Sequence, residues 1–341
     1  MADTAVRAGH RPATLRRTWL AAAIAVSVAP FGLAVALAPA AGANPTVALT
    51  WLLFVGSSVH VAATGWFYCV PEVRAHMRAH PGRYAVAPVA LVFALAVAVP
   101  LLSPAALTGL LLGFFAWQFF HFQKQNVGVA ALAARAVGVA ALTSWERRAL
   151  VVAGVGGIAG LVGHPALLQL ATHRHSDLLF AIGAAVSAAG ALLGGGALLT
   201  RAATGRPPVF VGLYLTGLLF FLPVFVFASP YAAVAGLTMA HGLQYLLLVT
   251  LLAAAPGQQR SVPVELLVLV NVALVLGLAL NHASHLHDAA GFGRAIFGAY
   301  LGLSVAHFVI DAGLWRLRDE FPRAFLTRRL PYLLANSGPF R

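Results

Sequence analysis

The sequence predicts an all-α, polytopic transmembrane helix bundle. Of its 341 residues, 60% are hydrophobic and only 9% are charged, and the mean hydropathy is +0.86. Such a composition lies outside the range of soluble domains. Because a membrane-spanning helix needs about 20 apolar residues, the chain has room for about nine to ten helices and no separate soluble domain. The single cysteine, Cys69, excludes an internal disulfide and a thiolate metal cluster.

Ten apolar runs define the predicted helices, with boundaries uncertain by a few residues. They cover residues 18–39, 46–70, 84–103, 105–134, 148–171, 178–200, 209–228, 230–253, 262–281 and 291–315. In the fourth run, Lys124 and Arg135 leave open an interfacial or broken segment over 126–142. The first run follows two arginines and precedes a small-residue stretch at 39–43, which together resemble a secretory signal peptide. Its length favours a retained helix, and cleavage is the alternative.

The basic residues predict the orientation of these helices. All but two of the 22 Lys and Arg residues fall in the tails or in the loops and helix ends on one side, and the exceptions are Arg174 and Arg294. By the positive-inside rule, that side is cytoplasmic. We therefore predict a multi-pass protein of the cell (inner or plasma) membrane, with cytoplasmic basic tails at 1–17 and 316–341 and a bundle at 18–315. The net charge of +13 then reflects orientation and contact with anionic lipid, and it does not require nucleic acid.

Four histidines lie inside predicted apolar helices: His60, His121, His241 and His307. All four are on even-numbered helices, which cross the membrane in the same direction. They lie about 11 to 16 residues from the predicted helix starts, a spread of about 8 Å at about 1.5 Å per residue. Histidine is costly inside a bilayer and usually faces the bundle interior or a cavity. We therefore expect the four imidazoles to occupy one layer.

Each histidine has polar residues at helical spacing, on the same helix face one turn away. These residues are Thr64 for His60, Gln118 and Gln125 for His121, Gln244 and Tyr245 for His241, and Asp311 for His307. Taken alone, any one histidine is explained by a hydrogen bond to a neighbouring helix. Taken together, the four histidines and the buried carboxylate predict a shared metal site. Such a donor set suits iron, copper or zinc better than magnesium or calcium, and iron is our first choice.

Asp311 has two possible roles in this pattern. It can bind the metal or accept the proton of His307 and so fix the imidazole tautomer. Alternatively, it can hydrogen-bond the helix end or pair with Arg316 or Arg318. We predict Asp311, Gln125 and Tyr245 as catalytic residues.

Two further histidine groups lie in predicted outer loops. One contains His282, His285 and His287, and the other spans residues 173–177. Histidine-rich loops can bind metal, but a solvated loop is the commoner explanation. Glycine-rich stretches at 154–163 and 190–196 are expected to permit close helix packing.

Two short motifs carry a resemblance to a known family. The H-x2-Q-Y motif from His241 to Tyr245 and the H-F-x2-D motif from His307 to Asp311 resemble the bacterial Brp/Blh β-carotene dioxygenases, which are polytopic proteins. The resemblance implies that the four membrane histidines hold iron and that O2 binds at an open position. It also implies a lipophilic substrate, carotenoid-like or lipid, which enters laterally from the bilayer.

Two other functions fit the same residues. Histidines on neighbouring helices can be axial ligands of haem, so a haem-binding membrane protein is one alternative. A proton-coupled transporter without metal is the other, with His307 and Asp311 relaying protons.

Overall fold

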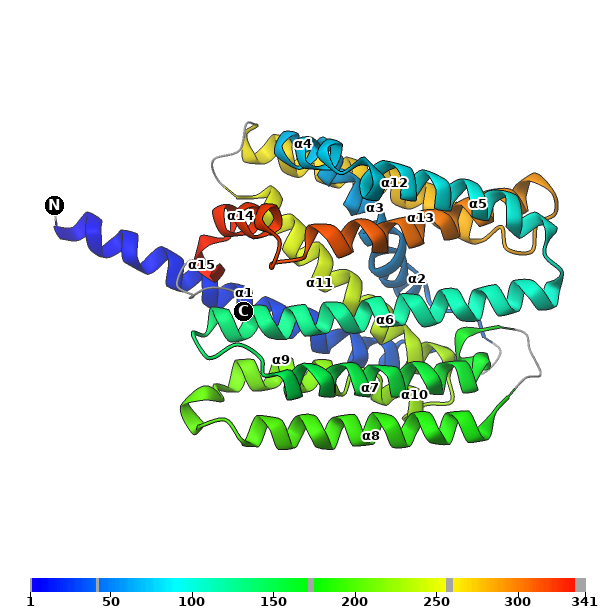
Figure 1. Ribbon diagram of the computed structural model, residues 1–341, viewed down its shortest axis with the longest axis horizontal. Coiled ribbons are helices and arrows are strands. Elements are labelled where there is room, and N and C mark those ends of the chain that lie inside the picture. The colour runs from blue at the N-terminus through cyan, green and yellow to red at the C-terminus, as the bar shows by residue number, and fades with distance from the viewer. Residues whose placement is uncertain (1, 41–42, 171–174, 256–259, 335–341) are drawn as a thin grey trace. The chain divides into compact units, whose positions relative to one another are not determined.

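The computed structural model describes all residues except 1, 41–42, 171–174, 256–259 and 335–341, and it describes side chains from Ala13 onward. The described residues are 83% helical and contain no strand (Figure 1). Within this part of the chain, eight helices are long and apolar enough to cross a membrane. The predicted all-α polytopic bundle is therefore confirmed.

The α-helices follow the predicted apolar runs closely. In the first half of the chain they are α1 (Ala2–Ala36), α2 (Val47–Phe54), α3 (His60–Ala63), α4 (Pro71–Ala79), α5 (Ala87–Leu101), α6 (Pro104–Ala136), α7 (Ser144–Gly163) and α8 (Asp177–Leu199). In the second half they are α9 (Pro208–Leu218), α10 (Leu222–Val226), α11 (Gly236–Ala253), α12 (Val262–Ser284), α13 (Phe292–Leu314), α14 (Glu320–Arg329) and α15 (Pro331–Leu334). Short π-helical turns at Val55–Val59, Gly82–Val86 and Tyr231–Ala235 extend α3, α5 and α11, and 3-10 turns lie at Thr64–Cys69, Pro165–Leu168 and Ala203–Gly205.

Two of the ten predicted crossings are not among the eight long apolar helices of the described residues. The run at 148–171 forms α7, which begins earlier and carries Glu146, Arg147 and Arg148 in its first turns. The run at 209–228 is divided between α9 and α10. The possible break at 126–142 is not observed up to Ala136, since α6 continues to that residue.

Large apolar side chains project outward from these helices. Leu101, Leu192 and Phe93 are 80%, 78% and 69% exposed. Water would not tolerate so many exposed apolar side chains on a monomer, whereas lipid would. The exposed surface therefore agrees with a membrane-spanning protein.

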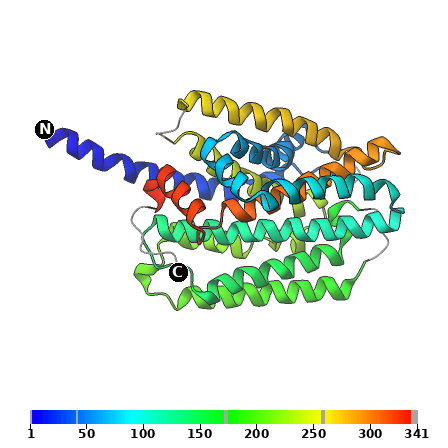
Figure 2. The same ribbon diagram turned by 45° about the horizontal axis from the view of Figure 1, so that its top comes forward.

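The described helices pack into two compact units. Unit 1 contains residues 1–45, 119–247 and 326–341, and unit 2 contains 46–118 and 248–325. In unit 1, α7 and α8 run side by side in both views (Figures 1 and 2). A Cβ atom at Gly183 of α8 would lie 2.5 Å from the backbone nitrogen of Gly160 in α7. The glycines therefore allow the close helix approach that the sequence predicted.

Unit 2 is organised around α13. It packs along α5, and a Cβ atom at Gly302 would lie 2.5 Å from Cα of Val92. Helix α12 packs against α3 and the π-helical turn before it. These contacts place the segment around His60 beside α12 and α13, so the packing of unit 2 positions His60 and His307.

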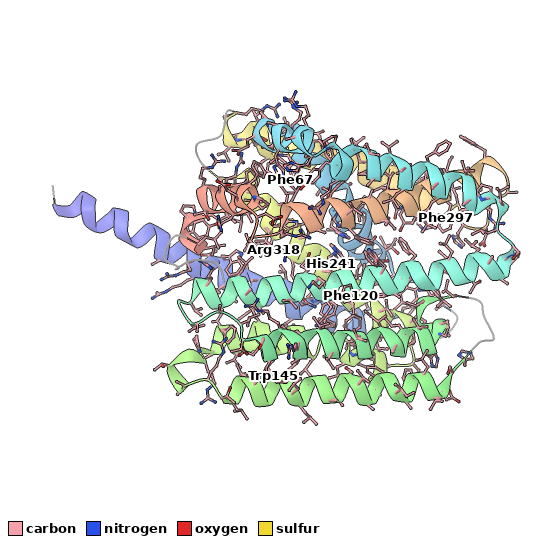
Figure 3. The ribbon with its side chains drawn as sticks, in the orientation of Figure 1. Phe67, Phe120, Trp145, His241, Phe297 and Arg318 are labelled. Carbon is pink, nitrogen blue, oxygen red and sulfur yellow. The ribbon has the colours of Figure 1, made fainter. Side chains whose placement is uncertain are left out.

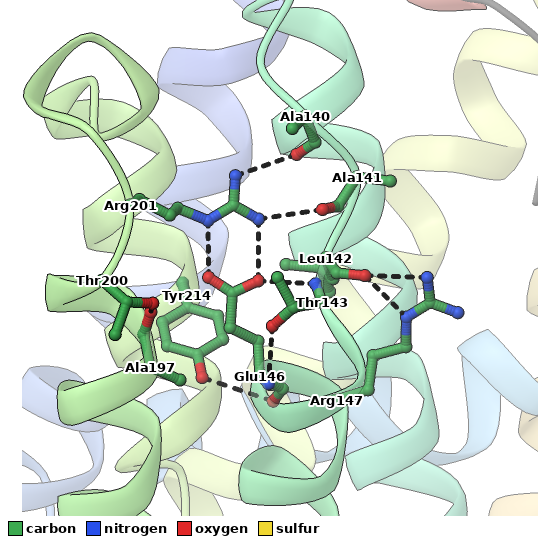
Figure 4. Close-up of polar contacts among 10 residues, drawn as sticks. All are labelled: Ala140, Ala141, Leu142, Thr143, Glu146, Arg147, Ala197, Thr200, Arg201 and Tyr214. Atoms are coloured by element: carbon green, nitrogen blue, oxygen red, sulfur yellow. Dashed lines mark hydrogen bonds and ion pairs between the residues drawn. The ribbon is translucent and has the colours of Figure 1, made fainter.

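A buried ion pair closes the α7–α8 hairpin in unit 1 (Figure 4). The guanidinium of Arg201 donates to both carboxylate oxygens of Glu146, at 2.5 and 2.7 Å. Arg201 also donates to the carbonyl oxygens of Ala140 and Ala141, and Thr143 forms a capping box with Glu146. Burial alone would raise the pKa of Glu146, but hydrogen bonds from Arg201 and Thr143 and the Arg201 charge hold it below its usual value.

Removing one partner of this pair should destabilise the protein strongly. Arg201→Met leaves a buried carboxylate without its cation, and we expect a loss of about 3–5 kcal/mol in the free energy of unfolding. The matched control is Arg148→Met, since Arg148 is exposed at the start of the same α7 and should change stability by less than about 0.5 kcal/mol. Equal unfolding temperatures of the two variants in detergent would contradict a stabilising role of the Glu146–Arg201 pair.

His76 joins α4 to α14 outside the membrane-spanning helices. Its ring stacks on Phe321, with centroids 4.1 Å apart and an interplanar angle of 3°, and lies 4.4 Å from the ring of His80. Burial, followed by nearby His80 and Arg83, lowers the pKa of His76 below 6.5, although Asp319 opposes the shift. The neutral imidazole is therefore the form that the folded state favours.

We expect the α4–α14 contact to weaken in acid. Because the folded pKa lies below the unfolded value, the unfolded state binds the proton first, and stability is lost as pH falls below about 6.5. Amide hydrogen exchange at residues 320–325, corrected for the intrinsic pH effect, should be faster at about pH 5.5 than at about pH 7.5. In His76→Phe, which keeps the stacking but cannot titrate, this difference should disappear. Its persistence there would assign the effect to another group.

Candidate metal centre

Unit 1 brings together two of the four predicted histidines. His121 on α6 and His241 on α11 lie edge to face, with ring centroids 5.0 Å apart and an interplanar angle of 77°. His241, which is labelled in Figure 3, is 1% exposed. Phe122 stacks on its ring, with centroids 3.9 Å apart. Two residues separated by 120 positions in the chain therefore form a pair inside one packed unit.

Side-chain amides hold α6 against α11 beside this pair. The Gln125 amide donates to the backbone carbonyl of His241 at 2.8 Å and to Oε1 of Gln244 at 2.9 Å. The Gln244 amide in turn donates to Oγ of Ser27 on α1 at 2.8 Å. Gln125 therefore positions the His241 helix. This chain of amides also ties the first helix to the histidine pair.

Unit 2 contains the other two predicted histidines. His60 begins α3, directly after the π-helical turn Val55–Val59, and His307 lies on α13. Their rings also lie edge to face, with centroids 5.2 Å apart and an interplanar angle of 78°. A ring nitrogen of each lies within 4.8 Å of the other, and the residues are 1% and 2% exposed. The same pair geometry thus occurs once in each unit.

The polar partners of His307 differ in part from the prediction. Thr64, expected beside His60, instead lies with its hydroxyl 2.6 Å from Nδ1 of His307. Asp311, which is 3% exposed, places Oδ2 at 3.6 Å from Nε2 of His307. Arg316 and Arg318 each place Nε 3.9 Å from a carboxylate oxygen of Asp319. The spacing of four residues therefore predicted the neighbourhood of Asp311 and His307. The contact between Thr64 and His307 depends on how the helices pack.

These distances can be compared with those of metal ligands. Nitrogen and oxygen ligands bind zinc-like ions at about 2.0–2.2 Å, so two ligand atoms of one ion are about 3.0–3.6 Å apart. The His307–Asp311 separation of 3.6 Å falls at the upper end of this range and exceeds an ordinary N–H···O hydrogen bond. With Thr64 at Nδ1, Nε2 is the nitrogen that faces the carboxylate. The hydroxyl thus has the orienting role that ligating histidines require.

The remaining predicted residues have separate surroundings. Tyr245 is 1% exposed on α11 in unit 1, and Gln118 lines a small cavity in unit 2. His285 and His287 are exposed, and they contact the backbone oxygens of Asn281 and Ser284 in the last turn of α12. His282 is also exposed. These local contacts fit the solvated-loop interpretation. Residues 173 and 174 of the other predicted histidine loop lie outside the described residues.

Sequence reasoning overlooked two residues near the unit 1 pair. Ser27 accepts the Gln244 hydrogen bond, and Gln123 donates to the carbonyl oxygens of Leu150 and Gly217. A lone serine in an apolar helix was the available signal for Ser27. Gln123 stands among three other polar residues in the run from 123 to 126, so its separate structural role was not visible in the sequence.

Comparisons with known proteins give no relative for this chain. No family model, no curated protein and no solved structure matches it.

Proposed function

We propose that this protein is an integral membrane metalloprotein. The proposed ligands are His60, His121, His241 and His307, with Asp311 as a further ligand or as the hydrogen-bond acceptor of His307. The observation that supports this proposal is the pair of edge-to-face imidazoles within each unit, with centroids 5.0 and 5.2 Å apart. Imidazoles that share one ion through ring nitrogens lie about 4.5–5.5 Å apart, given ligand bonds of about 2.0–2.1 Å.

Iron is the metal that we propose first, and copper and zinc are the other candidates. Imidazole suits all three, and adding one carboxylate favours iron over copper. Bound iron would supply activation of O2 for oxidation of a lipophilic substrate, carotenoid-like or lipid. The chain would contribute apolar surroundings, such as Phe122 against His241, and the positioning of His241 by Gln125. Tyr245, buried on the same helix as His241, is the further catalytic candidate.

The geometry within each pair favours a non-haem site over haem. Axial histidines of one haem lie on opposite faces of the macrocycle, with ring centroids about 6 Å apart for nitrogen bonds of about 2.0 Å. Rings at 5.0 and 5.2 Å in an edge-to-face arrangement leave no room for a flat macrocycle between them. A proton-coupled transporter remains the alternative function, since His307 and Asp311 are neighbours in an apolar helix.

Metal analysis of purified protein tests the proposal. The native protein should retain iron after desalting, and His241→Gln and His307→Gln should each lower the iron content, because each variant removes one of the proposed imidazole ligands. His285→Gln, which alters an exposed loop histidine, is the matched control and should keep the metal. If the native protein binds no transition metal, or if both buried variants retain it, the metal proposal is wrong and the transporter alternative is favoured.

Asp311→Asn adds a second readout to the same experiment. The amide has the size of the carboxylate but cannot accept the proton of His307 as an anion. We expect metal affinity to fall by about 10- to 100-fold while the thermal unfolding temperature stays close to native. Unchanged metal content with lowered stability would instead assign Asp311 to the scaffold.

We further propose that both termini are cytoplasmic. In unit 1, Arg135, Arg147 and Arg201 lie at the α6–α7 and α8–α9 ends of the helices. In unit 2, Arg294 donates to the carbonyl of Leu102 at the opposite end of α5 from Arg83. A reporter fused after residue 341 should be active only in the cytoplasm, and one inserted at residue 289 only outside. The reverse pattern would refute the charge argument.

A further inference from the structure

A small cavity lies within unit 2 beside His60. Its volume is about 20 Å³. Six of the residues that line it are polar: Ser57, Ser58, His60, Gln118, Tyr300 and Ser304. They come from the π-helical turn, α3, α6 and α13. Such a group is unusual inside apolar membrane helices, where each polar side chain needs a hydrogen-bond partner.

One acceptor atom of this cavity lacks a hydrogen-bond donor. Oε1 of Gln118 is buried and has no hydrogen-bond partner among the described residues. The hydroxyls of Ser57 and Ser304 donate to the carbonyl oxygens of Leu53 and Tyr300, at 2.6 and 3.0 Å. Their oxygens are therefore acceptors as well. Acceptor oxygens of Gln118, Ser57 and Ser304 therefore line the cavity beside the hydroxyls of Ser58 and Tyr300, and a small molecule that can both donate and accept hydrogen bonds matches this lining.

The size of the cavity restricts that molecule. A water molecule needs a cavity in which a water-sized sphere can occupy about 10–15 Å³, and it typically makes about three hydrogen bonds. A cavity of about 20 Å³ therefore has room for one water and is too small for a lipid or a carotenoid.

We propose that this cavity is a binding site for one water molecule, which donates a hydrogen bond to Gln118 and lies beside His60. The water would satisfy the Gln118 carbonyl oxygen and donate its second hydrogen to a serine oxygen. Its use as a source of protons for chemistry at His60 rests on the proposed function, whereas its presence does not.

Hydroxyl-radical labelling by X-ray radiolysis tests the site, because radicals form from waters held inside the protein. Phe308 lines the cavity and is 5% exposed, whereas Phe67 does not line it and is 1% exposed. Both phenylalanines are shielded from bulk solvent and belong to unit 2. In the native protein in detergent, Phe308 should label several-fold faster than Phe67. Equal rates would overturn the proposal.

Gln118→Met sharpens the test, since methionine has a similar length but no acceptor oxygen. Phe308 labelling should fall to the Phe67 rate, and the unfolding temperature should not fall. Gln123→Met is the matched control, because Gln123 is already hydrogen-bonded to two backbone carbonyls. It should lower stability and leave Phe308 labelling unchanged. Undiminished Phe308 labelling in Gln118→Met would overturn the proposal.

The two proposals fail separately. Labelling is measured on chelator-treated protein and on His307→Gln, so it requires no bound metal. If the native protein binds no metal but Phe308 labels fast, the metal proposal is wrong and the water site stands. Retained metal with slow labelling would remove the water site alone.

Discussion

The structure depends on the cost of polar groups inside apolar helices. Lipid in a bilayer core offers no hydrogen bond to a buried imidazole, amide or carboxylate, so each of them must find a partner on its own or a neighbouring helix or in a water held within the protein. Thr64 does so with His307, and Gln125 does so with Gln244 and the His241 carbonyl. These hydrogen bonds fix which faces of the helices pack together, and they decide the orientation of the histidines.

The two units meet this requirement in related ways. Each contains two histidines from helices that are far apart in the chain. Their rings lie edge to face, with centroids 5.0 Å apart in unit 1 and 5.2 Å apart in unit 2. In unit 1 the supporting groups are amides and the Ser27 hydroxyl, whereas in unit 2 they are a hydroxyl and a carboxylate. The histidine pair of unit 2 therefore has a carboxylate beside it. The histidine pair of unit 1 is held by neutral amides and a hydroxyl.

The charged side chains Glu146 and Arg201 lie at helix ends and pair with each other. Glu146 and Arg201 are both nearly buried, yet they form a bidentate pair whose other polar atoms are satisfied by the backbone. The pair joins the start of α7 to the segment that follows α8, and the glycine contacts bring the two helices close further along their length. The ion pair and the histidine pairs are separate groups, since neither Glu146 nor Arg201 belongs to a histidine pair. Variants of the ion pair and of the histidines can therefore be interpreted independently.

The sequence by itself determined the helical class, the bounds of most apolar helices and the placing of Asp311 one turn from His307. These features are local, because they depend on hydropathy over about 20 residues or on spacing along one helix. Only the tertiary structure decided that His121 pairs with His241 and His60 with His307, that the Thr64 hydroxyl contacts His307, and that Ser27 joins the amides. Those contacts join residues more than 100 positions apart. Their partners are chosen by which helix faces pack together, which the periodicity of a single helix does not specify.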